Sequence, residues 1–175
     1  RERDPRARLM ADRTKRQEEN FRILVAQLTH ESISYRVKAA EALGRIGDPE
    51  ALEPLLACLD DPETDVQWVA ARALGTLKDT RAGPALISLL GRRDRWVRQG
   101  SAWALGELED PCAIEPLGTL LSDPKKDVRI TVAEALGKIG NVRAEPALRI
   151  ALQDEEPDVR AAVRAALRRI GISPE

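Results

Sequence analysis

The chain of 175 residues contains 43% hydrophobic, 33% charged and only 3% aromatic residues. This length can bury the core of one domain, and few aromatic residues with abundant Ala and Leu are typical of an all-helical protein. The formal net charge of −1 excludes a global basic field that attracts nucleic acid or anionic lipid, and no apolar run reaches the roughly 20 residues of a membrane span.

A short sequence recurs five times at a fixed spacing of 31 residues. The copies are Ala42-Leu43-Gly44, Ala73-Leu74-Gly75, Ala104-Leu105-Gly106, Ala135-Leu136-Gly137 and Ala166-Leu167-Arg168. Self-similarity at such a period indicates a stack of supersecondary units that share one continuous core. We therefore predict an all-α fold, an α-α superhelix of two-helix repeats with half-repeat caps at both ends, in a single domain spanning residues 1–175.

Residues 1–31 are expected to form the N-terminal cap. Residues 20–29 match the second helix of later repeats, because their apolar positions occupy the same columns: Phe21, Leu24, Val25 and Leu28. No repeat-like first helix precedes them. Asp4-Pro5 is a typical helix start and predicts a helix that runs into this segment. Residues 6–19 are mostly charged and lack the core pattern, which indicates a capping extension or, as the alternative, a partner-binding arm.

Full repeats follow at residues 32–62, 63–93, 94–124 and 125–155. Each is predicted to contain a first helix, a tight turn and a second helix. In the first helix at residues 65–77, a rotation of about 100° per residue directs one apolar arc to the core, formed by Val66, Ala70, Ala73, Leu74 and Leu77. The spacing predicts C-terminal caps at Gly47, Gly140 and Gly171, and helix starts at Asp48-Pro49 and Asp110-Pro111.

The C-terminal cap is expected at residues 156–175, where a first helix at 158–170 has no second helix after it. Arg168 stands there in place of the repeat glycine, which indicates an end that faces solvent. First helices carry small residues on their flanks, whereas second helices carry leucines. Because small side chains allow close approach, we expect the first helices on the inner, concave side of a curved stack.

The two cysteines lie two repeats apart. Cys58 falls in a leucine column of the core, and Cys112 lies at a helix start. Since neighbouring packed helices are roughly 8–10 Å apart, these thiols are too distant for a disulfide. Free thiols suit a reducing compartment, so we expect a cytoplasmic protein.

The unit Asp127-Val128-Arg129 with Ala133-Glu134-Ala135-Leu136-Gly137-Lys138-Ile139-Gly140 resembles the HEAT-like repeat of the phycobilisome-lyase type. Copies such as Asp158-Val159-Arg160 extend the resemblance over about residues 20–171. It implies a HEAT-like solenoid that serves as a scaffold, as in chromophore lyase subunits, assembly proteins and artificial binders. In those binders the ligand surface looks to fall on first-helix positions. The chain departs from the pattern at Tyr35, Gly100, Ser101, Asn141 and Arg168.

All three tryptophans fall in solvent-side columns of adjacent first helices. Exposed tryptophans are enriched in binding hot spots. Gly100 costs roughly 0.5–1 kcal/mol inside a helix and is expected to leave a notch between two indoles for a ligand side chain. In the alternative interpretation, the indoles fill the groove and shield one another. The candidate partner-binding residues are Trp68, Val69, Arg72, Arg95, Trp96, Gln99, Gly100, Trp103, Glu107, Ile130 and Glu134.

We expect a non-catalytic scaffold that binds a protein or peptide, without cofactor or metal, as a monomer or weak oligomer. His30 is the only histidine and has no ligating neighbour in sequence; Glu41 and Glu134 lie three repeats apart, too far for a catalytic pair. Two alternatives stay open. One is a bilin lyase-like or bilin-handling subunit whose tryptophans shield a tetrapyrrole, and the weaker one is nucleic-acid binding by aromatic stacking.

Overall fold

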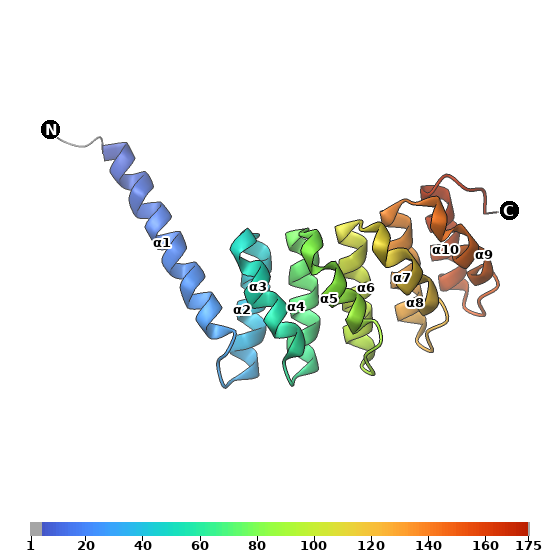
Figure 1. The fold of residues 1–175 in the computed structure, drawn as a ribbon, viewed down its shortest axis with the longest axis horizontal. Helices are drawn as coiled ribbons and strands as arrows, with labels where there is room; N and C mark the ends of the chain where they lie inside the picture. Colours follow the sequence, from blue (N-terminus) through green and yellow to red (C-terminus); the bar gives the residue numbers. More distant parts are fainter. Residues whose placement is uncertain (1–4, 175) are drawn as a thin grey trace.

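The computed structural model describes residues 5–174, with side chains from residue 14 to residue 174. Every regular element in that range is helical, and the helices alternate between two rows (Figure 1). The first helices are α2 (Ile33–Ile46), α4 (Thr64–Leu77), α6 (Arg95–Leu108), α8 (Lys126–Ile139) and α10 (Pro157–Arg169). The shorter second helices are α3 (Leu52–Ala57), α5 (Gly83–Leu89), α7 (Ile114–Leu120) and α9 (Glu145–Ala151).

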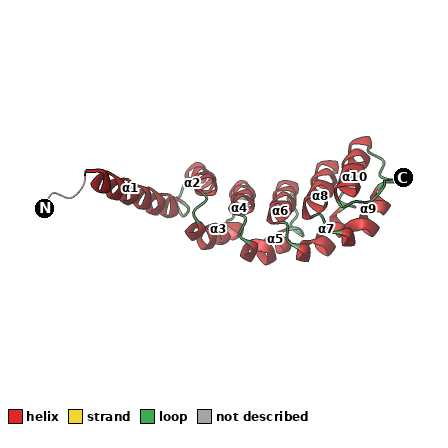
Figure 2. Ribbon diagram, turned by 90° about the horizontal axis from the view of Figure 1, so that it is seen from above, coloured by secondary structure: helices red, strands yellow, loops and turns green. Residues whose placement is uncertain are grey.

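The two rows bend into an arc (Figure 2). The row from α2 to α10 lies on the inner side of the arc, and the row from α3 to α9 lies on the outer side. The predicted α-α superhelix, with a concave face made from the first helices, is confirmed. We call this inner surface the concave face.

Contacts between glycine and alanine set the close spacing of the first helices. A Cβ added at Gly44 would lie 2.8 Å from the Cβ of Ala73, and one added at Gly106 would lie 2.8 Å from the Cα of Ala135. Side chains do not approach this closely, so the helices are near each other because glycine stands at these positions. The recurring Ala-Leu-Gly is thereby explained, since the glycine of one repeat receives the alanine of the next. Arg168, which stands in the glycine column on α10, is exposed.

Helices α3 and α7 begin at the predicted aspartates, but through a short 3-10 turn. The Asp48 carboxylate accepts a hydrogen bond from the Glu50 backbone N–H at 3.0 Å, and the turn Pro49–Ala51 leads into α3. Proline fits this turn because the first backbone N–H of a helix needs no partner within the helix. The same arrangement recurs before α7, where Asp110 precedes the turn Pro111–Ala113.

Left-handed residues end the first helices. Gly47, Gly140 and Gly171 adopt φ values of 71°, 69° and 81°, so the predicted glycine caps are confirmed. After α4 and α6 the same position is filled by Lys78 and Glu109, with φ values of 55° and 53°. These two residues adopt a conformation that glycine adopts at lower cost.

Inter-repeat ion pairs tie a first helix to the loop before the next first helix. The Arg36 side chain donates from Nε to Asp61 Oδ2 at 2.8 Å and from Nη2 to Asp61 Oδ1 at 3.1 Å. The 31-residue repeat places two equivalent bidentate pairs, which are Arg98–Asp123 and Arg129–Asp154. The repeat at 63–93 has Gln67 and Arg92 in these columns, so the joint between α4 and α6 lacks the ion pair.

Helix α1 (Pro5–Gln27) starts at Pro5, as the sequence predicts, and runs without a break into the expected second-type helix. It contacts α2 at its C-terminal end and projects from the stack at the other end (Figure 1). Leu28 is buried, whereas every side chain from residue 14 to residue 20 is exposed. The described side chains of the charged segment therefore extend from the stack and do not cover it.

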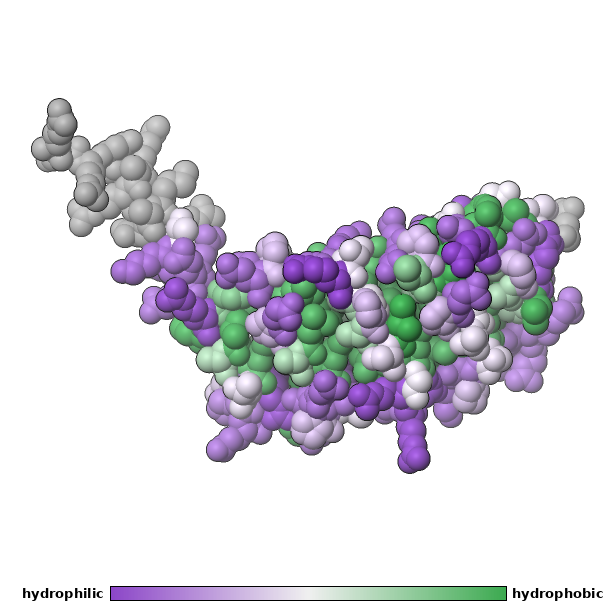
Figure 3. Space-filling model, in the orientation of Figure 1, coloured by the Kyte–Doolittle hydropathy of each residue, from purple (hydrophilic) through white to green (hydrophobic). Residues whose placement is uncertain are grey.

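Apolar residues also reach the surface away from the concave face. Figure 3, in the orientation of Figure 1, shows apolar patches across the middle of the stack between hydrophilic margins. On the second-helix side, Ile150 of α9 is 78% exposed. This outer surface therefore provides a control position for substitutions on the concave face.

Candidate partner-binding surface

Trp68 of α4 lies over Gly100 of α6. A Cβ added at Gly100 would lie 2.7 Å from Trp68 Cδ1 and 3.2 Å from its Nε1, so only glycine leaves room for this indole. The expectation that Gly100 opens a notch for a ligand is wrong, because the chain fills the notch with its own Trp68. Gly100 is buried as a result, and a partner can reach the indole above it rather than the glycine.

Val69 is likewise less accessible than the sequence predicts. Its side chain is only 5% exposed, because the first helices approach each other closely at this column. It contributes to the floor of the concave face rather than to its open surface.

Trp103 of α6 packs over Gly75 of α4, in the opposite direction across the same joint. A Cβ added at Gly75 would lie 3.0 Å from Trp103 Cζ3. The guanidinium of Arg72 lies 4.4 Å from the Trp103 ring centroid and 5.5 Å from the Trp68 ring centroid. Both indoles are partly buried, Trp68 against Gly100 and Trp103 against Gly75, so the interpretation that indoles fill the groove describes Trp68 and Trp103. We refer to Trp68, Arg72 and Trp103 as the indole–guanidinium cluster.

Trp96 remains exposed at the start of α6. Asp94 caps this helix, because its Oδ1 accepts hydrogen bonds from the backbone N–H groups of Trp96 at 2.8 Å and Val97 at 3.1 Å. The indole is 48% exposed, and the Arg95 guanidinium lies 4.3 Å from its ring centroid. The groove-filling interpretation therefore does not extend to Trp96.

The α8 side of the candidate surface is held by polar contacts. Gln99 Nε2 donates to Thr131 Oγ1 at 3.1 Å. Glu107 pairs with Lys138 of α8 and lies 3.9 Å from the ammonium of Lys78. The carboxylate of Glu107 is therefore largely neutralised by lysines of the protein. Two further candidates differ in exposure, since Ile130 is partly buried and Glu134 is exposed.

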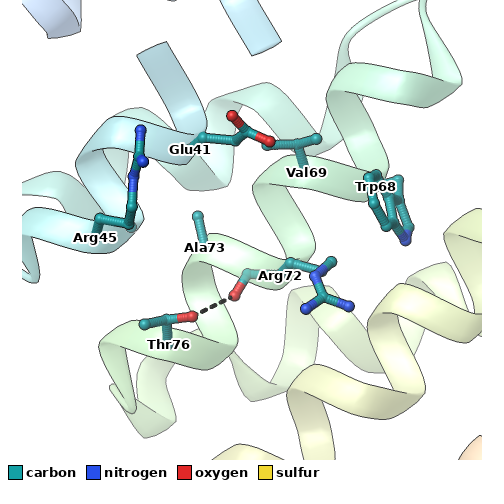
Figure 4. Close-up of a pocket in the computed structure, with 8 residues that line it drawn as sticks. Glu41, Arg45, Trp68, Val69, Arg72, Ala73 and Thr76 are labelled. Carbon is teal, nitrogen blue, oxygen red and sulfur yellow. Dashed lines mark hydrogen bonds between the residues drawn. The ribbon is translucent and has the colours of Figure 1, made fainter. Parts of the chain in front are cut away.

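A hollow of about 260 Å³ opens between α2 and α4, beside the cluster (Figure 4). Val69 and Ala73 contribute apolar atoms to it, and Trp68 stands at its edge. The candidate set omitted five of its residues, and three of these share 31-residue columns with predicted site residues: Glu41, Arg45 and Thr76. Glu41 shares a column with Arg72 and Trp103, while Arg45 and Thr76 share one with Glu107. Comparison of columns could therefore have found them.

The cysteines and the histidine lie outside this surface. Cys58 is buried and Cys112 exposed, and both are free thiols, as expected. Burial raises the pKa of Cys58 to about 11, with a further increase from the Asp61 carboxylate, so the thiol is protonated at neutral pH. His30 is exposed; its Nδ1 accepts a hydrogen bond from the Ser32 backbone N–H at 3.0 Å, and its ring stacks on Tyr35.

Within the part of the chain that the structure describes, no three His, Cys, Asp or Glu side chains gather where they could bind a metal ion. Over the same residues, no helix combines the length and apolar character needed to cross a membrane.

Residues 21–105 and 83–168 match the family of HEAT repeats. The chain belongs to the HEAT-repeat family. The resemblance inferred from the 31-residue unit is thereby confirmed. No curated protein sequence matches this HEAT-repeat chain.

Solved structures share the HEAT-repeat fold. The complex of CpcE and CpcF of phycocyanin lyase from Nostoc sp. PCC7120 contains a chain 29% identical to this one, with a TM-score of 0.78, over 86% of this chain and 64% of that chain. The HEAT-repeat chain thus spans less than two thirds of the length of that relative. A designed armadillo repeat protein in complex with the peptide (KR)4 is 22% identical, with a TM-score of 0.68, over 84% of this chain and 80% of that chain. Human deoxyhypusine hydroxylase is 24% identical, with a TM-score of 0.54, over 88% of this chain and 74% of that chain. The last two share the fold alone.

Proposed function

We propose that this HEAT-repeat chain is a non-catalytic scaffold that holds a segment of a partner protein on its concave face. The observation that carries the proposal is the 48% exposed indole of Trp96. On the first helices, the exposed large apolar side chains are Trp96 of α6 and, at the α2 end of the stack, Ile33, Tyr35 and Ile46. An exposed indole reduces solubility, and its burial by a partner supplies much of the affinity at binding hot spots.

The surroundings of Trp96 support the same role. Trp103 lies two turns away on the same helix, and the indole–guanidinium cluster holds Trp68 and Trp103 in fixed positions before any partner binds. Side chains that are already ordered lose little conformational freedom on binding. A rigid aromatic surface on a concave face suits an extended or helical segment better than a flat protein surface.

Charges around the tryptophans favour a protein partner over a nucleic acid. Cations such as Arg72 and Lys138 alternate with the carboxylates of Glu41, Glu107 and Glu134. A phosphate backbone needs a continuous row of cations, whereas the polar rim of a protein interface commonly carries both signs. The designed armadillo neighbour, which is in complex with a peptide, is compatible with this use of the fold.

The test is selection of displayed peptides on the wild-type protein, followed by affinity measurement with Trp96→Ala. Removal of an indole from the centre of an interface should weaken binding about tenfold or more. The matched control is Ile150→Ala, which removes an exposed apolar side chain from the outer row and should leave affinity unchanged. Selected peptides that bind Trp96→Ala as tightly as the wild type would refute the proposed surface, provided both proteins have the same thermal melt.

A bilin-handling or lyase-subunit role is the second candidate. It is supported by the 29% identity to a chain of the phycocyanin lyase complex. In this role the exposed Trp96 and the indole of Trp103 would stack on a tetrapyrrole. Mixing the purified protein with a free bilin should then shift the visible absorption band and quench tryptophan fluorescence, and Trp96→Ala should reduce both effects. An unchanged absorption band would exclude this candidate.

A further inference from the structure

Arg72 is a cation without a carboxylate partner in the middle of the concave face. Among the described residues its guanidinium has two indoles as neighbours, at 4.4 and 5.5 Å from the ring centroids. Three other cations of the first helices do have carboxylate partners: Arg98 and Arg129 form bidentate pairs with aspartates, and Lys138 pairs with Glu107. The charge of Arg72 is therefore available to a ligand.

Stacking on indoles prepares the guanidinium for a carboxylate. The guanidinium carbon lies over two aromatic rings, which reduces the hydration of the group on those sides and restricts its rotation. The N–H donors lie in the plane of the group, at its edge, so stacking leaves them free to form two parallel hydrogen bonds with a carboxylate. An arginine held in this way loses less freedom on binding than a mobile surface arginine.

The hollow beside Arg72 adds charge and apolar surface. Arg72, Arg45 and Glu41 are among its lining residues, so their formal charges sum to one positive charge, and the Arg72 guanidinium lies next to the hollow on the α6 side. Val69 and Ala73 provide an apolar floor (Figure 4). The ligand that complements these groups has one negative group next to an apolar side chain.

We infer that the partner segment of the proposed function is acidic, and that an Asp or Glu carboxylate of this segment binds Arg72 while an adjacent apolar side chain enters the hollow. This inference depends on the concave-face scaffold role and specifies its partner. A basic segment would place a second cation against Arg72, which is unfavourable. A polyanion such as nucleic acid would meet the exposed carboxylates of Glu41 and Glu134 on either side.

The test uses three sets of short peptides that share the same leucine and alanine positions and carry Asp/Glu, Asn/Gln or Lys/Arg between them. Binding is followed by tryptophan fluorescence, because all three tryptophans of the chain lie on this surface. The acidic peptides should bind the wild type at least about tenfold more tightly than the amide peptides, since a charge-assisted bidentate bond is lost in the amides. High salt should weaken this preference.

Protein variants separate the failure of this inference from the failure of the proposed function. Arg72→Gln should abolish the preference for acidic over amide peptides. Arg72→Lys should retain part of it, because lysine keeps the positive charge but cannot donate two parallel hydrogen bonds to one carboxylate. Arg164→Gln, which removes an exposed arginine of α10, should change nothing. Two outcomes would overturn the role of Arg72 alone. The first is equal binding of acidic and amide peptides that still requires Trp96, and the second is a preference for basic peptides or oligonucleotides. Peptide binding that is independent of Trp96 would overturn both proposals.

Discussion

At the scale of single residues, Ser101 is a buried hydroxyl without a hydrogen-bond partner among the described residues. Its column holds Ala70 in the preceding repeat, so the fold has no need of a hydroxyl there. An unpaired buried hydroxyl costs about 1–3 kcal/mol, and alanine also has the higher helix propensity. Ser101→Ala should raise the free energy of unfolding in urea by about 1 kcal/mol. Ala70→Ser should lower it by a similar amount, and a loss of stability in Ser101→Ala would show that the hydroxyl is satisfied.

The repeat glycines reverse the usual effect of alanine in a helix. Gly→Ala inside a helix normally stabilises by up to about 1 kcal/mol. At Gly106 the added Cβ would lie 2.8 Å from the Cα of Ala135, and backbone cannot move aside as a side chain can. We expect Gly106→Ala to destabilise by about 1–3 kcal/mol in urea denaturation. Gly91→Ala meets open space and should remain within about 0.5 kcal/mol of the wild type. Equal stability of both variants would mean that the helices separate without cost.

At the scale of helices, the left-handed C-terminal residue of α6 is an unfavourable end. Glu109 adopts a φ of 53°, whereas equivalent positions after α2 and α8 hold glycine. Glu109→Gly relieves this conformation and should stabilise the protein by about 0.5–1 kcal/mol, seen as a higher melting temperature. Gly140→Ala, the reverse change after α8, should lower the melting temperature. No gain in Glu109→Gly would indicate that the greater entropy of the unfolded glycine variant cancels the relief.

Helices and their caps were predictable because they depend on residues near in sequence. Apolar spacing located the first helices, and Gly47 and Gly140 marked their ends. Contacts across a joint were less predictable. Gly100 indicated open space, and only three-dimensional packing revealed that Trp68 fills it. The left-handed conformation of Lys78 is predictable because Lys78 shares a 31-residue column with Gly47 and Gly140, but not from its residue type. The same equivalence pointed to Trp96, whose exposure the sequence anticipated.

At the scale of the whole molecule, the inter-repeat ion pairs link successive repeats on the loop side of the stack. Burial raises the pKa of Asp154, but hydrogen bonds from Arg129 and from the Glu156 backbone outweigh it and hold the pKa below its ordinary value. This pair therefore stabilises the fold above the unfolded pKa of Asp, and its contribution is lost as the pH falls through the lowered value. The α4–α6 joint lacks such a pair and instead has the indole–guanidinium cluster on its concave side. The proposed binding surface thus spans the joint that has an exposed Arg92–Asp60 pair on its loop side instead of a bidentate one.

The missing ion pair can be installed, because the repeat specifies both positions. Gln67→Arg with Arg92→Asp recreates the columns of Arg36–Asp61 and Arg98–Asp123, whose side chains are about a tenth exposed or less. In a double-mutant cycle measured by urea denaturation, the two changes should couple favourably by about 1–2 kcal/mol. Gln67→Arg alone should gain nothing, because Arg92 would face the new guanidinium. Arg92→Asp alone should lose a little stability, because it removes the exposed Arg92–Asp60 pair. Zero coupling would mean that the α4–α6 joint differs in geometry from the others, and that packing of Trp68 and Trp103, rather than loss of the ion pair, sets the spacing of the joint.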